Sequence, residues 1–223
     1  MAGTVNWLSV NSGSASTPED FALTTTERRL QLRMGSYTVG YLIGSLSVDS
    51  INRTLSKALI RLAPDYLAFQ EISIRDLPLY NRDLDDDYPP AGRALKDAIA
   101  AVDAVLFVTP EYNRGVPGVL KNAIDWASRP HGTNSLAHKP SAVIGASPGK
   151  IGTAVAQQSL RSTLGFCDSP QMTAPEAYIQ FTRGLITDDG EVTEASTERF
   201  LRDYMEAFGA FVTRVLTVLP RVG

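Results

Sequence analysis

The sequence predicts an α/β fold in which helices cover both faces of a five-stranded parallel sheet. From residue 37 onward, apolar segments alternate with segments of helical periodicity about 10 to 15 residues long. The segment 104–109 (AVLFVT) is apolar on both faces, as a central parallel strand is when helices cover each side. Turns rich in Gly, Ser and Pro follow three of the apolar segments. These observations favour a doubly wound, three-layer sandwich.

Each element follows from a local pattern. The expected strands are residues 37–44, 67–74, 104–109, 141–146 and 177–181. The expected helices are residues 53–62, 91–101, 119–128, 153–164 and 193–219. A polar loop that contains prolines, residues 76–90, separates the second strand from the second helix. The last helix is amphipathic, with an expected buried side of Phe200, Tyr204, Phe208, Phe211 and Val215.

Five strands in roughly 190 residues favour the flavodoxin-like strand order 2-1-3-4-5, in which ligands bind beyond the carboxyl ends of the first and third strands. Three loops are expected at that edge, namely 44–52, 110–118 and 147–152. No repeat or second domain is indicated, so residues 34–223 are expected to form one domain. Residues 1–33 are rich in Ser, Thr and Gly and are expected to be a mostly disordered extension, with a structured arm as the alternative.

The first of these loops has the composition of a phosphate site. After Gly44 it offers Ser45, Ser47, Ser50 and Asn52 as a helix begins. Backbone N–H groups and the positive end of the helix dipole point toward such a loop, and hydroxyl groups add hydrogen bonds. The alternative is that Ser50 and Asn52 only cap the helix.

Two better-known phosphate motifs are absent from the sequence. No GxGxxG follows the first strand, so the dinucleotide fingerprint fails. The motif GxxxxGK[ST] also fails, because Ile151 follows the Gly149-Lys150 pair. A serine-rich loop around one phosphate suits a mononucleotide such as FMN better than a triphosphate.

The composition bears on location and partners. The net charge of −3 provides no basic field for nucleic acid or an anionic membrane. Cys167 is the single cysteine, so no internal disulfide can form, which agrees with a reducing cytoplasm. His131 and His138 lack a second pair of ligands for zinc or iron. The cysteine content leads us to expect a cytoplasmic protein. No apolar run approaches the roughly 20 residues that span a bilayer.

Four segments resemble the NADPH-dependent FMN reductase family. In chain order they are GSLSVDSINRTLSKAL, LPLYNRDL, VTPEYNRGVPGVLKNAIDWASRP and ASPGKIGTAVAQQSLR. Within that family the sequence is most similar to bacterial NAD(P)H quinone, chromate and azo-dye reductases of flavodoxin-like fold. The resemblance covers about residues 37–216, and PEYN followed by PGxLKNAIDW is its most specific part.

The resemblance implies that three loops bind FMN. The loop expected to bind the phosphate contains Ser45, Leu46, Ser47, Ser50 and Asn52. The loop expected to lie along the isoalloxazine ring, largely through backbone groups, contains Pro110, Glu111, Tyr112 and Asn113. The loop expected to close over the flavin contains Ser147 and Gly149. Read without the resemblance, Glu111 would be a solvated charge and Tyr112 would simply fill its loop.

The sequence departs from the family pattern in two places. The family usually has an arginine after GS-Leu, whereas this chain has Ser47, so Arg53 or a partner subunit would have to supply the cation. The family's paired glycines at the end of the third loop are Gly152-Thr153 here. Both departures bear on the affinity for FMN.

Several other residues have competing interpretations. Asn122 and Asp125 are expected to cap or brace the ring loop, and Trp126 is expected in the core or an interface. Arg161 is either a surface charge or, as in related reductases, a subunit contact. Cys167 is expected to be buried and inert.

The predicted activity is a two-step flavin oxidoreduction. NADPH or NADH is expected to deliver hydride to FMN and leave, after which a quinone, azo dye, metal oxyanion or free flavin takes the electrons. A homodimer or homotetramer is expected, with apolar helix faces around 119–126 and 160–166 as the interface. Two alternatives stay open, namely an electron carrier reduced by a partner protein and a flavin-free regulatory or scaffold protein.

Overall fold

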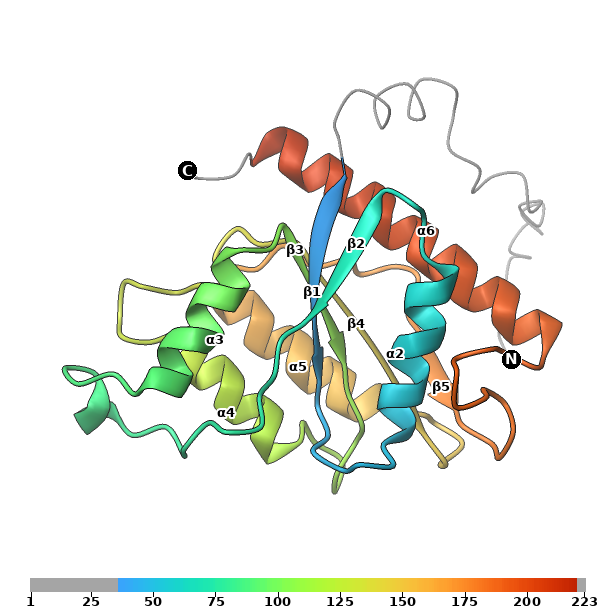
Figure 1. The fold of residues 1–223 in the computed structure, drawn as a ribbon, viewed down its shortest axis with the longest axis horizontal. Helices are drawn as coiled ribbons and strands as arrows, with labels where there is room; N and C mark the ends of the chain where they lie inside the picture. The colour runs from blue at the N-terminus through green and yellow to red at the C-terminus, as the bar shows by residue number, and fades with distance from the viewer. Residues whose placement is uncertain (1–35, 220–223) are drawn as a thin grey trace, which may run out of the picture.

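Residues 36–219 are described in a computed structural model, in which five parallel strands lie in the order β2-β1-β3-β4-β5 (Figure 1). The strands are β1 (Tyr37–Ile43), β2 (Leu67–Glu71), β3 (Ala104–Val108), β4 (Ser141–Ser147) and β5 (Tyr178–Gln180). The helices are α2 (Ile51–Leu62), η2 (Arg82–Leu84, 3-10), α3 (Pro90–Ala100), α4 (Gly118–Ala127), α5 (Ala154–Phe166) and α6 (Ala195–Val218). The predicted flavodoxin-like order is confirmed. The expected extension, 1–33, lies outside the described residues.

Two layers of helices enclose the sheet. Helices α2 and α6 cover one face, and α3, α4 and α5 cover the other. Alternation along β3 divides its side chains between the two cores, with Leu106 and Val108 on the α2–α6 side and Val105 and Phe107 on the opposite side. All four are almost completely buried, which explains why this strand is apolar on both faces.

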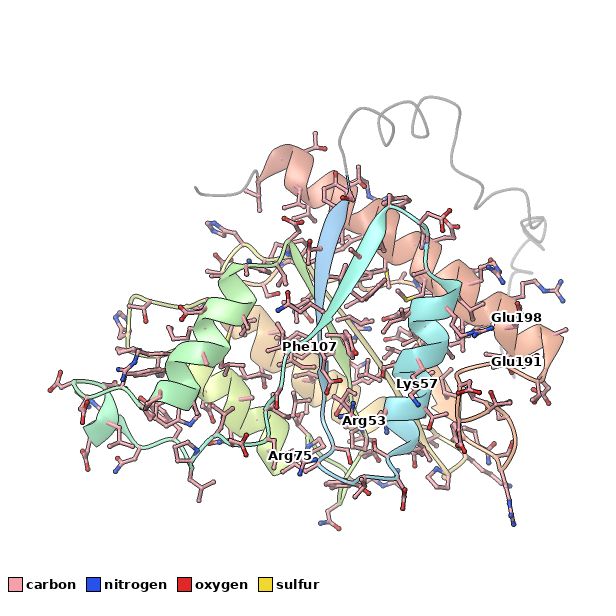
Figure 2. The ribbon with its side chains drawn as sticks, viewed as in Figure 1. Arg53, Lys57, Arg75, Phe107, Glu191 and Glu198 are labelled. Carbon is pink, nitrogen blue, oxygen red and sulfur yellow. The ribbon has the colours of Figure 1, made fainter. Side chains whose placement is uncertain are left out.

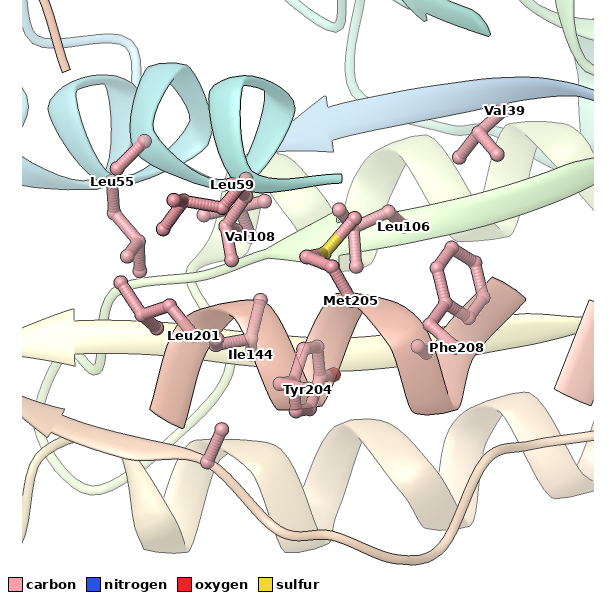
Figure 3. Packing of buried hydrophobic residues seen from close by; sticks show 14 of the residues in the cluster. Val39, Leu55, Leu59, Leu106, Val108, Ile144, Leu201, Tyr204, Met205 and Phe208 are labelled. Carbon is pink, nitrogen blue, oxygen red and sulfur yellow. The ribbon is translucent and has the colours of Figure 1, made fainter. Parts of the chain in front are cut away.

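The core beneath α6 is drawn in Figure 3. Leu55 and Leu59 of α2 and Phe208 of α6 pack in it and are fully buried. Tyr204 of α6 is also buried, and its hydroxyl group donates a 2.9 Å hydrogen bond to the carbonyl oxygen of Val143. Burial without a hydrogen bond would cost about 1–3 kcal/mol, so this contact lets a phenol occupy an apolar layer.

Strands β1, β3 and β4 end in register. Ile43 pairs with Val108, and Val108 pairs with Ile144. Two hydrogen bonds continue this pairing past the strands, from Gly44 N to Val108 O and from Thr109 N to Ile144 O, both 2.9 Å long. The loops that follow these strands therefore leave the sheet side by side at its carboxyl edge.

All five predicted helices and five predicted strands are present, and nine of these ten elements have ends within two residues of the prediction. The exception is β2, which ends at Glu71 rather than at residue 74. Ile72 N still donates to Tyr41 O of β1 at 2.9 Å, but the paired register ends at Glu71. Ile72 and Ile74 are buried in the core on the α3–α5 side. Because these two residues are buried, the sequence stays apolar beyond Glu71, and this led to the prediction of a strand up to residue 74.

The predicted buried side of α6 is wrong in part. Phe200 is 38% exposed, whereas Leu201 and Met205 are fully buried. Gly209 is also on the buried side, where a methyl group would collide with the Tyr66 hydroxyl group. Because this contact face includes a residue without a side chain and the aliphatic Leu201 and Met205, the aromatic residues alone do not mark it.

Two further observations concern the whole described part of the chain. Between residues 36 and 219 no helix has the combined length and apolar composition needed to cross a membrane. Within the same residues, no group of three or more His, Cys, Asp or Glu side chains is placed to hold a metal ion.

Candidate functional site

Three loops meet at the carboxyl edge of the sheet, and hydrogen bonds join them. The Oγ atom of Ser45 in the first loop lies 3.4 Å from the Oη atom of Tyr112 in the second. Glu111, also in the second loop, accepts 3.0 Å hydrogen bonds from Val155 N and Ala156 N in the first turn of α5, which follows the third loop. The sequence placed these loops at one edge, and the structure brings them into contact.

The first loop leaves hydroxyl groups available for a ligand. Ser45 is 5% exposed, and its Oγ atom accepts a hydrogen bond from Ser47 N at 3.3 Å. Ser50 holds the N-cap position of α2, yet its side chain makes no capping hydrogen bond. The interpretation of Ser50 as a simple helix cap is therefore wrong, and its hydroxyl group remains available at the mouth of the loop.

Backbone N–H groups of this loop are also available. The first N–H groups of a helix have no partner within it, and they carry the positive end of the helix dipole. Among residues 36–219, the amides of Leu46, Ile51 and Asn52 donate to no acceptor. This combination of hydroxyl and amide donors at a helix N-terminus fits a phosphate group.

The side chain of Asn52 has a different task from the one predicted. Its Nδ2 atom donates to Ala146 O at 3.0 Å, and its Oδ1 atom accepts from Ala146 N at 2.9 Å. The side chain is 1% exposed, so it ties α2 to β4 instead of facing a ligand. Asn52 therefore reaches the site only through its backbone.

The second loop turns sharply at its tip. Tyr112 and Gly115 exchange two backbone hydrogen bonds, 3.2 and 3.0 Å long, around Asn113 and Arg114. Both central residues have positive φ, 51° and 62°, as a type I′ turn requires. This conformation costs a residue such as arginine about 1 kcal/mol, and observed strain of this kind is a reason to suspect function. Tyr112 remains 51% exposed at the mouth of the site.

Glu111 is neither a solvated charge nor free to reach a ligand. Its side chain is only 8% exposed, and one carboxylate oxygen accepts hydrogen bonds from two first-turn amides of α5, Val155 N and Ala156 N. The other oxygen lies 3.3 Å from Arg114 Nη1. A carboxylate at this position is stabilised by the helix dipole, so Glu111 fixes the second loop against the third.

The third loop lies so close to neighbouring backbone that it requires glycine at Gly152. Ser147 Oγ accepts from Gly149 N at 3.1 Å, and Gly149 O accepts from Gly152 N at 2.9 Å. Gly152 has a φ of 57°, and a side chain there would meet the Tyr178 backbone at 2.7 Å. Gly145 lies beneath the loop, where a methyl group would overlap the Thr109 carbonyl oxygen.

A cavity of about 400 Å³ opens between the second and third loops. Its lining consists of Glu111, Asn113, Arg114, Ser147, Gly149, Lys150, Ile151 and Gly152. Four of these residues were predicted, whereas Arg114, Lys150, Ile151 and Gly152 were missed as lining residues, although all four adjoin predicted ones. The volume lies within the range of small-molecule sites, about 300–1,000 Å³. The first loop does not line this cavity; its Ser45 Oγ atom lies 3.4 Å from the Oη atom of Tyr112, which stands between the lining residues Glu111 and Asn113 in the sequence.

The charges near the first loop differ from the prediction. Arg53 holds the Glu71 carboxylate with two hydrogen bonds, 2.8 and 2.9 Å long, so its guanidinium group is not available to a phosphate. This hydrogen-bonding arginine lowers the pKa of Glu71 below its ordinary value. Arg75, which the sequence did not single out, donates from Nη2 to Leu46 O at 3.0 Å.

The residues of α4 brace the loop that precedes α3. Asn122 accepts from Tyr80 N and donates to Pro78 O, both at 2.8 Å. Trp126 is fully buried and also donates to Pro78 O, at 2.7 Å. Asp125 forms an ion pair with Lys121 on the same helix. The apolar side of α4 is thus used inside the chain, and the part of the interface prediction that relied on it is not supported.

Arg161 and Cys167 lie farther from the site. Arg161 Nη1 donates to Met172 O at 2.8 Å, and its Nε and Nη2 atoms are buried with no partner in the described part of the chain. Arg161 is therefore not the surface charge that one interpretation expected. Cys167 is buried, and this burial raises the pKa of its thiol, which keeps it protonated.

The comparisons with known proteins agree with this geometry. The profile of a family described as NADPH-dependent FMN reductase matches residues 37–183. The chain is 45% identical to a 2-hydroxy-1,4-benzoquinone reductase from a Burkholderia species, across 78% of this chain and 95% of that protein. It is also 45% identical to a quinone reductase from Pseudomonas putida, across 79% of this chain and 95% of the relative.

A solved structure supports the same relationship. FerB, a flavoenzyme NAD(P)H:(acceptor) oxidoreductase from Paracoccus denitrificans, is 48% identical with a TM-score of 0.77. The match covers 80% of this chain and 98% of FerB. The predicted family resemblance and the predicted class of enzyme are confirmed. A profile that matches most of the chain, together with these relatives, shows that the protein belongs to the NADPH-dependent FMN reductase family.

Proposed function

We propose that the protein binds FMN without a covalent link and uses it to pass electrons from NADPH or NADH to small-molecule acceptors. The observation that most supports this proposal is the meeting of three polar loops at one edge of the sheet, with available hydroxyl and amide donors at the start of α2. FMN supplies the hydride chemistry when it is bound, while the chain supplies orientation and access.

The first loop holds the phosphate in this proposal. The hydroxyl groups of Ser45, Ser47 and Ser50 donate to phosphate oxygens, and the amides of Leu46 and Asn52 add backbone donors. Charge-assisted hydrogen bonds of this type are about twice as strong as those between neutral groups. This loop should therefore bind a charged phosphate more tightly than a neutral ligand.

The second and third loops hold the ring system. Asn113 presents backbone groups along it, and Tyr112 fences the open side. Pro110 supports these residues from the buried side, since its carbonyl oxygen accepts a hydrogen bond from Thr109 Oγ1 at 2.8 Å. Glu111 positions these groups through the start of α5 instead of touching the ring. Ser147 and Gly149 close the other side of the cavity.

The pyridine nucleotide and the acceptor use the same opening in turn, which is a ping-pong mechanism. Quinone-type acceptors are favoured because the relatives quoted above are named for them, while azo dyes, metal oxyanions and free flavin share the same entrance. A homodimer or homotetramer in the cytoplasm completes the proposal. On α5, the exposed side chains of Val155 and Phe166 are candidate contacts between subunits.

The test begins with the visible spectrum of the purified protein. A flavin spectrum that NADPH bleaches without air, and a quinone then restores, is the expected result. A protein that takes up no FMN and oxidises no NADPH would contradict the proposal. Reduction that requires a second protein would instead identify an electron carrier.

The kinetics test the order of events. Initial rates at several fixed quinone concentrations, plotted in double-reciprocal form against NADPH, should give parallel lines. Lines that intersect would exclude the ping-pong order while leaving the FMN-dependent activity in place.

A further inference from the structure

A cation from another part of the chain lies on the first loop. Arg75 follows β2, and its Nη2 atom donates to the carbonyl oxygen of Leu46 at 3.0 Å. The two residues are 29 positions apart in the sequence. Figure 2 shows Arg75 beside the loop that follows β1, while Arg53 lies on α2. The fold thus brings a guanidinium group to a loop that itself contains no Lys or Arg before Arg53.

The two arginines near this loop differ in their charge partners. Arg53 is bound through two nitrogen atoms to Glu71. Arg75 makes no ion pair with any of residues 36–219, and it is exposed. Its contact to a neutral carbonyl group uses one of the five N–H donors of a guanidinium group. Arg75 therefore carries an uncompensated positive charge beside the loop.

The position of Arg75 is held from both ends. Its backbone N–H group donates to Ser73 Oγ at 3.3 Å, which shapes the turn after β2. Its guanidinium group is held by Leu46. Two acidic residues need to be considered, namely Asp76, which is next to Arg75 in the sequence, and Asp49, which belongs to the first loop. Neither forms an ion pair with Arg75 among residues 36–219.

We infer that Arg75 is the cation that binds the FMN phosphate in this protein. This inference rests on the proposed function, because it requires FMN in the first loop. Hydroxyl groups, amides and a helix dipole supply only partial charges, whereas a phosphate monoester carries about −1.5 to −2 at pH 7. A guanidinium group matches phosphate geometry with paired N–H donors. Leu46 orients Arg75 so that its remaining donors serve the phosphate.

The test compares two flavins that differ in the phosphate alone. FMN and riboflavin are titrated separately into the flavin-free protein, and quenching of flavin fluorescence gives each Kd. For Arg75→Gln, the Kd for FMN should rise about 5- to 30-fold, while the Kd for riboflavin should stay within about 2-fold. Arg75→Lys should give an intermediate loss for FMN, since it retains the charge without the paired donors.

A matched control is available on α2. Arg61 is an exposed arginine in the last turn of α2, at the opposite end from the first loop. Arg61→Gln should leave both Kd values unchanged. Thermal unfolding of the flavin-free variants should match that of the parent chain, which separates binding from folding. Added salt should weaken FMN binding to the parent chain more than to Arg75→Gln.

The possible results separate three explanations. Equal weakening of FMN and riboflavin would overturn the inference, because Arg75 would then act only on the shape of the loop. An unchanged Kd for FMN in Arg75→Gln would also overturn it. A parent chain that binds neither flavin would contradict the proposed function itself, which is a different and recognisable failure.

Discussion

The polar groups at the amino edge of the sheet are paired with one another, whereas several of those at the carboxyl edge are not. At the amino edge, Thr38 and Asp103 hold each other through Thr38 N to Asp103 Oδ2 and Asp103 N to Thr38 O, both at 2.7 Å. Lys139 donates to the carbonyl groups of Ile99 and Val102 at 2.8 and 2.6 Å, which caps the end of α3. At the carboxyl edge, amides and hydroxyl groups of the first loop are available.

The contrast has a physical reason. A buried polar group without a partner costs about 1–3 kcal/mol, so an edge that only joins elements pairs its polar groups internally. An edge that binds a ligand has to keep donors available and loses that stabilisation until the ligand arrives. Ser50 and Asn52 show both solutions two residues apart, since the Asn52 side chain is fully engaged with Ala146 and the Ser50 side chain makes no cap.

The largest expected effect concerns the packing beneath the binding edge. Gly145→Ala should lower the free energy of unfolding by about 3 kcal/mol or more, because the added methyl group would overlap Thr109 O and approach Thr153 Oγ1 to 2.6 Å. Gly149→Ala is the matched control, since its methyl group would lie 3.5 Å from Ser147 Oγ, an ordinary contact. Urea unfolding measures both. An equal loss of unfolding free energy in Gly145→Ala and Gly149→Ala would show that the close backbone approach at Gly145 is not important for the packing beneath the loops.

The next effect separates the joining edge from the binding edge. Asp103→Ala should lower the free energy of unfolding by about 1–3 kcal/mol, because Asp103 is buried and its carboxylate holds Thr38 N. The Kd for FMN should not change. Asp97→Ala, which removes an exposed carboxylate from α3, should change stability by less than about 0.5 kcal/mol. A rise in the FMN Kd of Asp103→Ala would break the distinction between the two edges.

A smaller effect on stability, with a larger one on binding, is expected at Ser50. Ser50→Ala should cost less than about 0.5 kcal/mol, because no cap is lost, whereas a true N-cap serine contributes about 1 kcal/mol. The Kd for FMN should rise about 3- to 10-fold. The control is Ser56→Ala on the same helix, where the hydroxyl group already donates to Arg53 O at 2.8 Å and binding should be unaffected. A large loss of stability in Ser50→Ala with unchanged binding would assign Ser50 to the helix instead.

The smallest effect is a dependence on pH at Glu71. The pKa of Glu71 is lowered below its ordinary value of 4.5, mainly by hydrogen bonds from Arg53. A carboxylate with a lowered pKa in the folded state stabilises the protein above the pKa of the unfolded state, and this contribution is lost as the pH falls through the folded pKa. The pair is partly exposed, so the contribution should be under about 1 kcal/mol.

The measurement compares Glu71→Gln with the parent chain by urea unfolding. The parent chain should be the more stable of the two near pH 7, and the difference should disappear well below pH 4.5. A difference that persists in acid would mean that packing, and not charge, distinguishes the variants.

Much of the fold could be predicted because its causes are local. The doubly apolar β3 and the leucines of α2 follow from periodicities of two and 3.6 residues. The end of β2 was missed because Ile72 and Ile74 are buried in the other layer and keep the pattern apolar. The buried face of α6 was predicted incorrectly in part, because it includes Gly209, which carries no hydrophobic side chain and packs against Tyr66.

The candidate site could likewise be predicted only in its local features. The three loops and their residue types are visible in the sequence, and so is the family they belong to. The hydrogen-bond and ion-pair partners of individual side chains are not visible in the sequence. Arg75 was overlooked because nothing in its neighbourhood along the chain connects it with Leu46.

By itself, therefore, the sequence determined the order of strands and helices, the edge at which ligands bind and the polar character of the loops there. These properties depend on patterns within one element and on the general geometry of parallel sheets. Only the tertiary structure decided which polar groups are engaged and which stay available, as for Ser50, Asn52 and Glu111. That distinction depends on distances between residues far apart in the chain, which no local pattern encodes.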